Sequence, residues 1–220
     1  NVERILFMVA AQQPTPDLWV IDQFLHYWQI NNIPVTMIVN KMDLLIHDTA
    51  SFFKNYVDLD YSLIYMEARQ LTEVAKNTLF DLIHNKTVML AGQSGVGKST
   101  LLRSLVPTSL ALTGDVSKKS QRGRQTTKQA SLYYCSDANA HVVDTPGFSM
   151  VTPTVFTLQT TQMFYADVLL SATQCRFPNC RHSREPHCAV KRAHETNEIF
   201  EFRYQNYLKT LALLEKNKKW

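Results

Sequence analysis

Short apolar runs alternate with segments of helical periodicity along most of this 220-residue chain. None of these runs is long enough to span a bilayer, so they indicate buried strands. The predicted strands cover residues 3–11, 33–39, 63–68, 87–92, 131–135 and 141–147. The predicted helices cover residues 18–30, 71–84 and 99–106, and a last one runs from about Thr196 to Lys216. Strands that alternate with helices predict a mostly parallel α/β sheet flanked by helices, with its ligand at the carboxyl ends of the strands.

Residues 92–99 read GQSGVGKS and stand between a predicted strand and a predicted helix. In that context the pattern predicts a phosphate-binding loop, although a chance glycine-rich turn would look the same. Backbone N–H groups would point at the phosphates, Lys98 would reach the β- and γ-phosphates, and the Ser99 hydroxyl would bind Mg²⁺. The predicted nucleotide contacts of this loop are Gly92, Gln93, Ser94, Gly95, Val96, Gly97, Lys98, Ser99 and Thr100.

The tetrapeptide DTPG at 144–147 follows another apolar strand. Asp144 would hold Mg²⁺, and the N–H of Gly147 would contact the γ-phosphate. Alone this signal is weak, because Asp-Thr-Pro-Gly is also a good turn sequence. The phosphate loop upstream makes the metal-binding interpretation the stronger one.

The tetrapeptide NKMD at 40–43 predicts the base. The carboxylate of Asp43 would accept two hydrogen bonds from N1–H and the exocyclic amine of guanine, a donor pair that adenine lacks. Asn40 would brace the loop, and the stem of Lys41 would lie over the ring. The alternative is a plain turn at the end of a strand. The pattern favours GTP over ATP.

The order of these motifs is the reverse of an ordinary small GTPase, in which the phosphate loop comes first. A binding site requires that its loops be neighbours in space, whatever their order in the chain. If the termini of a GTPase domain were joined and the chain were opened at another loop, the same loops would still surround the pocket. The sequence therefore predicts a circularly permuted P-loop GTPase domain.

The composition changes at about residue 173, where Cys, His and Arg replace aliphatic residues. This divides the chain into predicted domains at 1–172 and 173–220, the second a small zinc-binding helical domain. Three thiolates and one imidazole would form a closed, structural zinc site, with His187 as a rival ligand for His182. The predicted ligands are Cys175, Cys180, His182 and Cys188. Cys135, within a predicted strand, is interpreted as a buried core thiol.

Bulk composition changes this picture little. Hydrophobic residues make up 45% of the chain and charged residues 19%, as in a packed globular protein. The net charge of +4 permits a nucleic-acid partner without arguing for one. Clustered cysteines indicate a reducing compartment, and no secretory leader opens the chain. We expect a cytoplasmic protein without a membrane segment, with an organelle matrix as the alternative.

Five segments together resemble the RsgA/YjeQ family of circularly permuted GTPases. They are NKMDLL, GQSGVGKSTL, SKKSQRGRQTT, VVDTPGF and CRFPNCRHSREPHCAV. The resemblance implies a factor that binds the small ribosomal subunit and its rRNA, assists late maturation of the subunit, and has subunit-stimulated GTPase activity. It also implies that His182, and not His187, is the zinc ligand. The family carries an OB-fold domain before the GTPase domain, and we expect that domain to be absent here.

The chain departs from the family at two places. Gln125 stands where the family's switch motif has histidine, and Glu67-Ala68 replaces the usual Ser-Ala, where a backbone N–H contacts guanine O6. Thr126 or Thr127, with Thr127 favoured, would bind Mg²⁺ in the GTP state. The predicted catalytic groups are Gln125, Lys98 and Thr127, with Gln125 orienting the attacking water. The alternative is that Gln125 is a solvated switch residue and hydrolysis is poor.

Arginine and lysine side chains surround the predicted zinc ligands and would contact rRNA phosphates, although composition alone would favour a solvated surface. They are Arg176, Arg181, Arg184, Lys191 and Arg192. The leading interpretation is a monomeric GTP-hydrolysing ribosome-assembly factor. The alternatives are a GTP-dependent RNA clamp with negligible catalysis, a zinc-stabilised RNA-binding protein with a vestigial nucleotide site, and, least favoured, a P-loop kinase.

Overall fold

The computed structural model describes residues 1–106, 130–145 and 155–217. The described residues within 1–16 and 32–150 form one compact unit, and those within 17–31 and 151–220 form a second. The functional division of the chain at 1–172 and 173–220 stays a prediction.

Six strands of the described residues form a single sheet in the first unit, in the order β3-β2-β1-β4-β6-β5. They are β1 (Arg4–Ala10), β2 (Val35–Asn40), β3 (Ser62–Tyr65), β4 (Thr87–Gly92), β5 (Ser131–Cys135) and β6 (Ala140–Asp144). Every neighbouring pair is parallel except β5 with β6. The prediction of a mostly parallel α/β sheet is confirmed.

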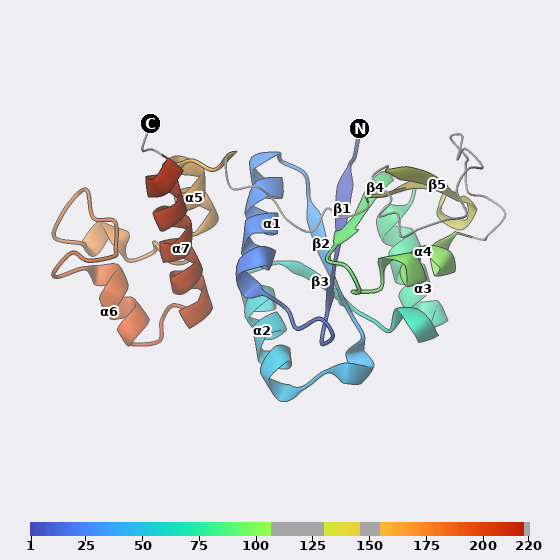
Figure 1. The fold of residues 1–220 in the computed structure, drawn as a ribbon, viewed down its shortest axis with the longest axis horizontal. Coiled ribbons are helices and arrows are strands. Elements are labelled where there is room, and N and C mark those ends of the chain that lie inside the picture. The colour runs from blue at the N-terminus through green and yellow to red at the C-terminus, as the bar shows by residue number, and fades with distance from the viewer. Residues whose placement is uncertain (107–129, 146–154, 218–220) are drawn as a thin grey trace, which may run out of the picture. The chain divides into compact units, whose positions relative to one another are not determined.

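The central strands are apolar almost without interruption because helices cover both faces of the sheet. β1, β2 and β4 bury all but their first residue, whereas the edge strand β3 buries none fully. In Figure 1, α3 (Glu73–Ile83) and α4 (Lys98–Leu105) lie on one side of the sheet and α2 (His47–Asp58) on the other. Leu79 of α3 and Leu101 of α4 join the core beside β4, so packing supports both flanks of the phosphate loop.

The register of the sheet brings the ends of four strands to one edge. Ala10 pairs with Asn40, Met8 with Gly92, and Leu90 with Asp144. Because these strands are parallel, the loops that follow them leave the sheet on the same side. The base-reading and phosphate-binding motifs are therefore neighbours, although fifty residues separate them in the chain.

The second unit consists mainly of helices. They are α1 (Leu18–Ile30), α5 (Leu158–Phe164), α6 (Ala189–Glu195) and α7 (Glu201–Asn217). Helices α1, α5 and α7 pack against one another (Figure 1). The last helix begins at Glu201, later than the predicted Thr196, because Asn197 ends α6 with φ of 60°. The N–H groups of Asn197 and Glu198 donate to His194 and Ala193 carbonyls, the hydrogen-bond pattern of a Schellman cap.

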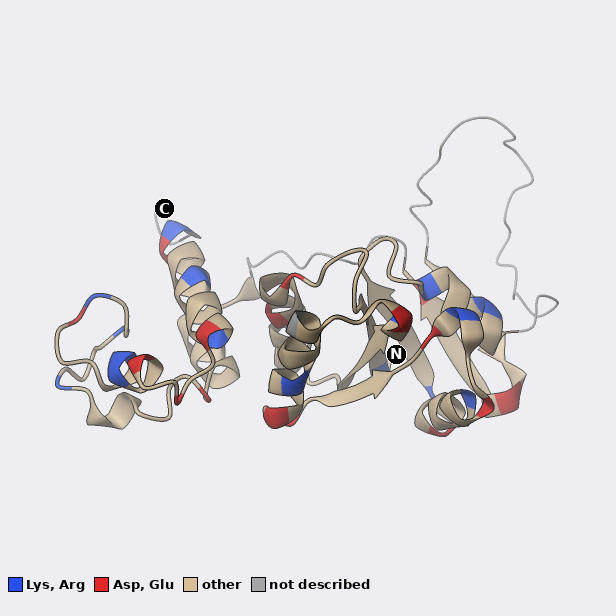
Figure 2. Cartoon of the chain, turned by 90° about the horizontal axis from the view of Figure 1, so that it is seen from below, with Lys and Arg blue, Asp and Glu red and all other residues tan. Residues whose placement is uncertain are grey.

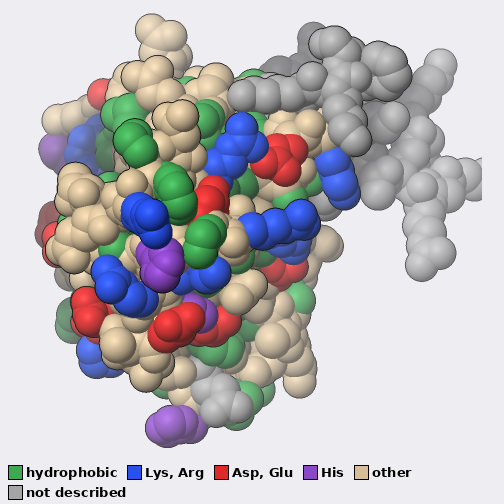
Figure 3. Space-filling model, turned by 90° about the vertical axis from the view of Figure 1, so that its left-hand side faces the viewer, with side chains coloured by type: hydrophobic (Ala, Val, Ile, Leu, Met, Phe, Trp, Pro, Cys, Tyr) green, Lys and Arg blue, Asp and Glu red, His purple; other side chains and the backbone are tan. Residues whose placement is uncertain are grey.

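Charged residues of the second unit lie on the loops around residues 175–188 and on α6 and α7 (Figure 2). The face drawn in Figure 3 shows Lys and Arg side chains gathered around hydrophobic and His side chains, with a few acidic ones among them. This face carries the predicted zinc segment.

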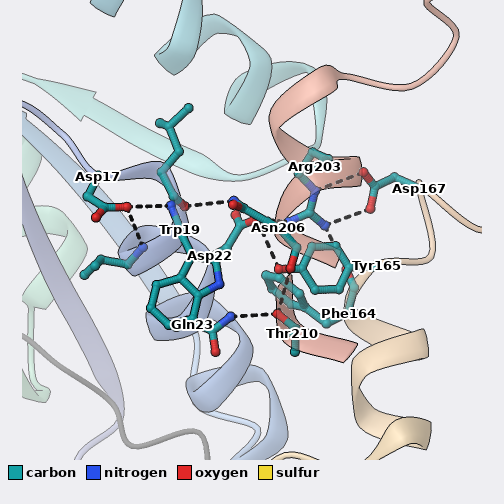
Figure 4. Close-up of polar contacts among 12 residues, drawn as sticks. Asp17, Trp19, Asp22, Gln23, Phe164, Tyr165, Asp167, Arg203, Asn206 and Thr210 are labelled. Carbon is teal, nitrogen blue, oxygen red and sulfur yellow. Dashed lines mark hydrogen bonds and ion pairs between the residues drawn. The ribbon is translucent and has the colours of Figure 1, made fainter. Parts of the chain in front are cut away.

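A buried polar cluster joins α1 to α7 inside the second unit (Figure 4). The guanidinium of Arg203 donates from Nε and Nη2 to the Asp167 carboxylate at 3.0 and 2.7 Å, and its Nη1 lies 3.0 Å from Asp22 Oδ2. Asp22 also accepts from Asn206 at 2.8 Å and from the hydroxyl of Tyr165 at 3.4 Å. Charge pairing and hydrogen bonding therefore offset the desolvation of these groups.

None of the helices in the described parts of the chain is both long and apolar enough to cross a membrane.

Candidate functional site

The phosphate loop depends on two glycines that tolerate no side chain. Gly92, the last residue of β4, has φ of 140°, and a Cβ there would lie 2.2 Å from the Met8 carbonyl oxygen. Gly97, which caps α4, has φ of 107°, and a Cβ there would lie 2.2 Å from Asn40 Nδ2. Both the backbone angles and the close approach of other loops therefore require glycine at these positions.

The side chain of Lys98, the first residue of α4, reaches back to the start of the phosphate loop. Its ammonium donates to the carbonyls of Gly92 at 2.6 Å and Gln93 at 2.9 Å. Burial lowers the pKa of Lys98, and the nearby Asp144 carboxylate opposes that shift. This cation is held where the phosphates of a nucleotide would lie over the loop.

Asp144 ends β6 beside β4 in the sheet. Burial raises the pKa of Asp144, and the Lys98 ammonium opposes that shift. Among the described residues its buried Oδ1 has no hydrogen-bond partner. A buried carboxylate oxygen without a partner fits a ligand of Mg²⁺, directly or through water.

One buried amide joins three loops of the base site. The Asn40 side chain, 3% exposed, donates from Nδ2 to the Val96 carbonyl at 2.8 Å. Its Oδ1 accepts from the backbone N–H of Ala68, also at 2.8 Å. The predicted bracing role of Asn40 thus has a definite geometry. The N–H of Ala68 therefore already donates to Asn40. The sequence had predicted that a backbone N–H of this Glu67-Ala68 motif would donate to guanine O6.

A pocket of about 270 Å³ opens beside Asn40. Asp43 lines it from a 3₁₀ turn at Met42–Leu44, and its side chain is exposed. Lys41 has φ of 61°, and its ammonium donates to the backbone carbonyl of Gln13, so its stem stays along the pocket wall. The lining residues are Gln13, Asn40, Lys41, Asp43, Leu44, Glu67, Ala68, Arg69, Gln70, Gly95, Gly97 and Thr100.

Sequence reasoning missed several of these lining residues, among them Gln13, Arg69 and Gln70. The available signal was positional, because they follow β1 and β3 at the carboxyl edge of the sheet. Ser99 and Thr100 lie in the first turn of α4, where both were expected. Four predicted residues lie outside the described parts of the chain, namely Gln125, Thr126, Thr127 and Gly147.

The second unit brings the four predicted zinc ligands together. One ligand atom from each of Cys175, Cys180, His182 and Cys188 lies within 4.8 Å of all the others. His182 Nδ1 lies 3.5 Å from the sulfurs of Cys175 and Cys188, and those two sulfurs are 3.8 Å apart. A tetrahedral zinc site with Zn–S bonds of about 2.3 Å requires S–S separations of about 3.8 Å and S–N separations of about 3.5 Å. The cluster therefore fits zinc, and within the described residues His187 is outside it.

Side chains from α7 and within the loop hold this cluster in shape. The Tyr204 hydroxyl donates to the His182 carbonyl at 2.7 Å, and Cys188 Sγ caps α6 by accepting from the Lys191 N–H. The Glu185 carboxylate accepts from the N–H groups of Arg181, Ser183 and Arg184. These hydrogen bonds lower the pKa of Glu185 to about 2, although its partial burial opposes them. Cys135 is buried in β5, where its thiol donates to the Leu105 carbonyl.

Known proteins are similar to this chain over most of its length. Residues 1–153 match the family described as RsgA GTPase. The protein called small ribosomal subunit biogenesis GTPase RsgA in Carboxydothermus hydrogenoformans is 36% identical over 208 residues, covering 94% of this chain and 71% of that protein. The protein of the same name in Phytoplasma mali is 33% identical over 227 residues, covering 100% and 72%.

Two solved structures resemble the fold. YjeQ from Thermotoga maritima has a TM-score of 0.70 and 30% identity, covering 97% of this chain and 72% of that one. YloQ, described as a circularly permuted GTPase, has a TM-score of 0.72 and 27% identity, covering 100% and 70%. The order of motifs along this chain agrees with a permuted fold.

Proposed function

The chain belongs to the RsgA GTPase family, and on this premise we propose that it hydrolyses GTP while assisting biogenesis of the small ribosomal subunit. The observation that carries the proposal is the junction at Asn40. This side chain holds the base-reading strand end against Val96 of the phosphate loop and Ala68 of the opposite wall. A single nucleotide could thus place its guanine beside Asp43 and its phosphates over Gly92–Lys98.

We propose that the site takes GTP or GDP with Mg²⁺. Lys98 and the loop amides would bind the phosphates, while Ser99, Thr127 and Asp144 would hold the metal. Bound Mg²⁺ neutralises charge on the β- and γ-phosphates. The unpartnered oxygen of Asp144 supports its part in this assignment. Gln125 remains our candidate for orienting the attacking water.

We further propose one structural zinc ion, held by Cys175, Cys180, His182 and Cys188. The separations among the ligand atoms of Cys175, His182 and Cys188 support this assignment, and the Cys180 sulfur lies within 4.8 Å of each of them. Four protein ligands leave no open coordination position, so the ion would fold the segment and take no part in hydrolysis.

The partner follows from the family. The relatives are named for biogenesis of the small ribosomal subunit, and we propose that this chain binds that subunit as a monomer, through rRNA. Basic side chains around the zinc segment support an RNA contact, because they would neutralise phosphates. The compartment would then be the one where ribosomes assemble, the cytoplasm in a bacterium.

The test is the GTP turnover rate of the chain with and without purified small ribosomal subunits. We expect turnover that rises when subunits are added, and little turnover of ATP. Lys98→Ala should abolish turnover with and without subunits, which makes it the control for contaminating hydrolases. Tight GTP binding without any turnover would instead support a clamp that uses GTP for conformation. Gln125 at the usual histidine position is the observation that keeps this second candidate open.

A further inference from the structure

The loop between the first two zinc-ligand candidates carries an exposed aromatic ring. Cys175 and Cys180 end the loop, and both belong to the ligand cluster. The N–H of Cys180 donates to the Phe177 carbonyl at 3.1 Å, which closes a tight turn with Pro178 at its second position. Proline is favoured there because its φ is already set for the turn. The backbone on which the Phe177 ring stands is therefore held at three points.

The ring of Phe177 is 41% exposed. The Arg176 guanidinium lies 5.7 Å from the ring centroid, within the range of a cation–π contact. A single exposed apolar residue needs no explanation by itself, so the argument depends on what surrounds it.

Several basic side chains of the zinc-ligand segment and of the α6 helix that follows it have no ion-pair partner within the described part of the chain. Among the described residues, no ion pair involves Arg176, Arg184 or Arg192. The nearest acidic group in sequence, Glu185, uses its carboxylate on backbone N–H groups of its own loop. Figure 3 shows a face on which Lys and Arg side chains gather around hydrophobic and His side chains, with some acidic side chains among them. Arg181 differs, because it pairs with Glu215.

We propose that this loop binds an unpaired nucleotide of RNA, with its base stacked on the Phe177 ring and its neighbouring phosphates on Arg176 and Arg184. The inference rests on the proposed rRNA contact and names the RNA element that this face takes. An aromatic face binds a base whose own faces are free, and bases within a duplex are already stacked. Duplex RNA would contact the arginines through its phosphates but would not stack on the Phe177 ring. An acidic protein would likewise require only the cations.

The experiment measures fluorescence anisotropy of the whole chain, zinc-loaded, with a labelled unstructured RNA oligonucleotide and a labelled blunt-ended RNA duplex whose strands have the same length. The wild-type chain should bind the unstructured RNA more tightly. Phe177→Leu, which keeps an apolar side chain without a ring, should bind the unstructured RNA about five- to a hundredfold more weakly, with duplex binding unchanged. Phe177→Trp should retain the preference. Arg184→Gln is the charge control and should weaken binding of both probes and reduce the salt dependence.

Equal binding of both probes by the wild-type chain, binding of neither, or unchanged binding by Phe177→Leu would each overturn the stacking inference. Zinc content of every variant shows that the loop has kept its fold. Subunit binding measured in parallel judges the proposed function separately. If the wild-type chain binds subunits but Phe177→Leu leaves RNA binding unchanged, only the stacking inference is refuted. If the wild-type chain binds no subunits, the proposed partner itself is refuted.

Discussion

Replacing Arg203 by alanine tests whether the buried ion cluster holds the second unit together. The Arg203 side chain is 1% exposed and pairs with both Asp22 and Asp167. It also donates to the Phe164 carbonyl at 3.0 Å, and its guanidinium lies over the rings of Phe164 and Tyr165 at 4.7 and 4.4 Å.

The expected cost follows from what the substitution leaves behind. Removing one partner of a buried ion pair typically destabilises a protein by about 3–5 kcal/mol, because the other charge is left unpaired. Asp22 would be that charge, since its side chain is fully buried. It would keep its hydrogen bonds from Asn206 and Tyr165, which limit the loss. We therefore expect Arg203→Ala to lower the free energy of unfolding by about 3–5 kcal/mol.

The matched control is the exposed pair of Arg181 and Glu215, whose side chains are 53% and 59% exposed. Glu215→Ala should cost less than about 1 kcal/mol, because solvent screens such a pair. Urea unfolding followed by tryptophan fluorescence suits both variants, since Trp19 and Trp28 lie in α1 of the same unit. Two variants of equal stability would refute the reasoning and show that packing, not the ion cluster, stabilises these helices.

Three further predictions concern the base, the zinc and a buried histidine. Asp43→Asn should weaken GTP binding by about a hundredfold, through loss of two charge-assisted hydrogen bonds, and improve binding of xanthine nucleotides; titration with fluorescent nucleotides checks both. Removing zinc with a chelator should reduce helical circular dichroism while leaving nucleotide affinity unchanged, and an unaltered spectrum would contradict a structural role. Burial lowers the pKa of His26 to about 4, so the unfolded chain takes up its proton first as the pH falls. Stability is then complete above about pH 6.5 and should fall by about 2 kcal/mol between pH 7 and pH 5. His26→Phe should remove that share of the fall in urea unfolding.

The apolar pattern predicted all six strands of the described sheet, most distinctly those buried on both faces. β1, β2 and β4 were visible because a parallel strand inside a sheet is apolar throughout. Helix α2 was missed, although Thr49, Phe53 and Tyr56 are buried at helical spacing. Its polar residues and lack of strong end signals hid that stripe. The break before α7 was also missed, because an asparagine in the left-handed conformation leaves only a weak trace in sequence.

The residues of the candidate site likewise fall into those that the sequence could predict and those that it could not. Motifs predicted the groups expected to touch a ligand directly, since phosphate, guanine and zinc each restrict which residue types can bind them. They did not identify contacts between loops, such as the carbonyl of Gln13 that receives the Lys41 ammonium. Any residue has a backbone carbonyl, so this contact depends on the neighbouring order of β1 and β2. Only the three-dimensional sheet order supplies that information.

The same contacts explain why a reversed motif order need not disturb the chemistry. Asn40 hydrogen-bonds Val96, 56 positions later, and Ala68, 28 positions later, and neither distance in sequence enters the energy of the bond. What the bonds require is that β2 and β4 both flank β1 and run parallel to it, so that their ends share an edge. Any chain opening that preserves this arrangement preserves the pocket. An Asn40→Ala chain, by contrast, keeps its order of motifs but loses the side chain that holds the loops together, and leaves a buried N–H and a buried carbonyl unpaired at a cost of about 1–3 kcal/mol each.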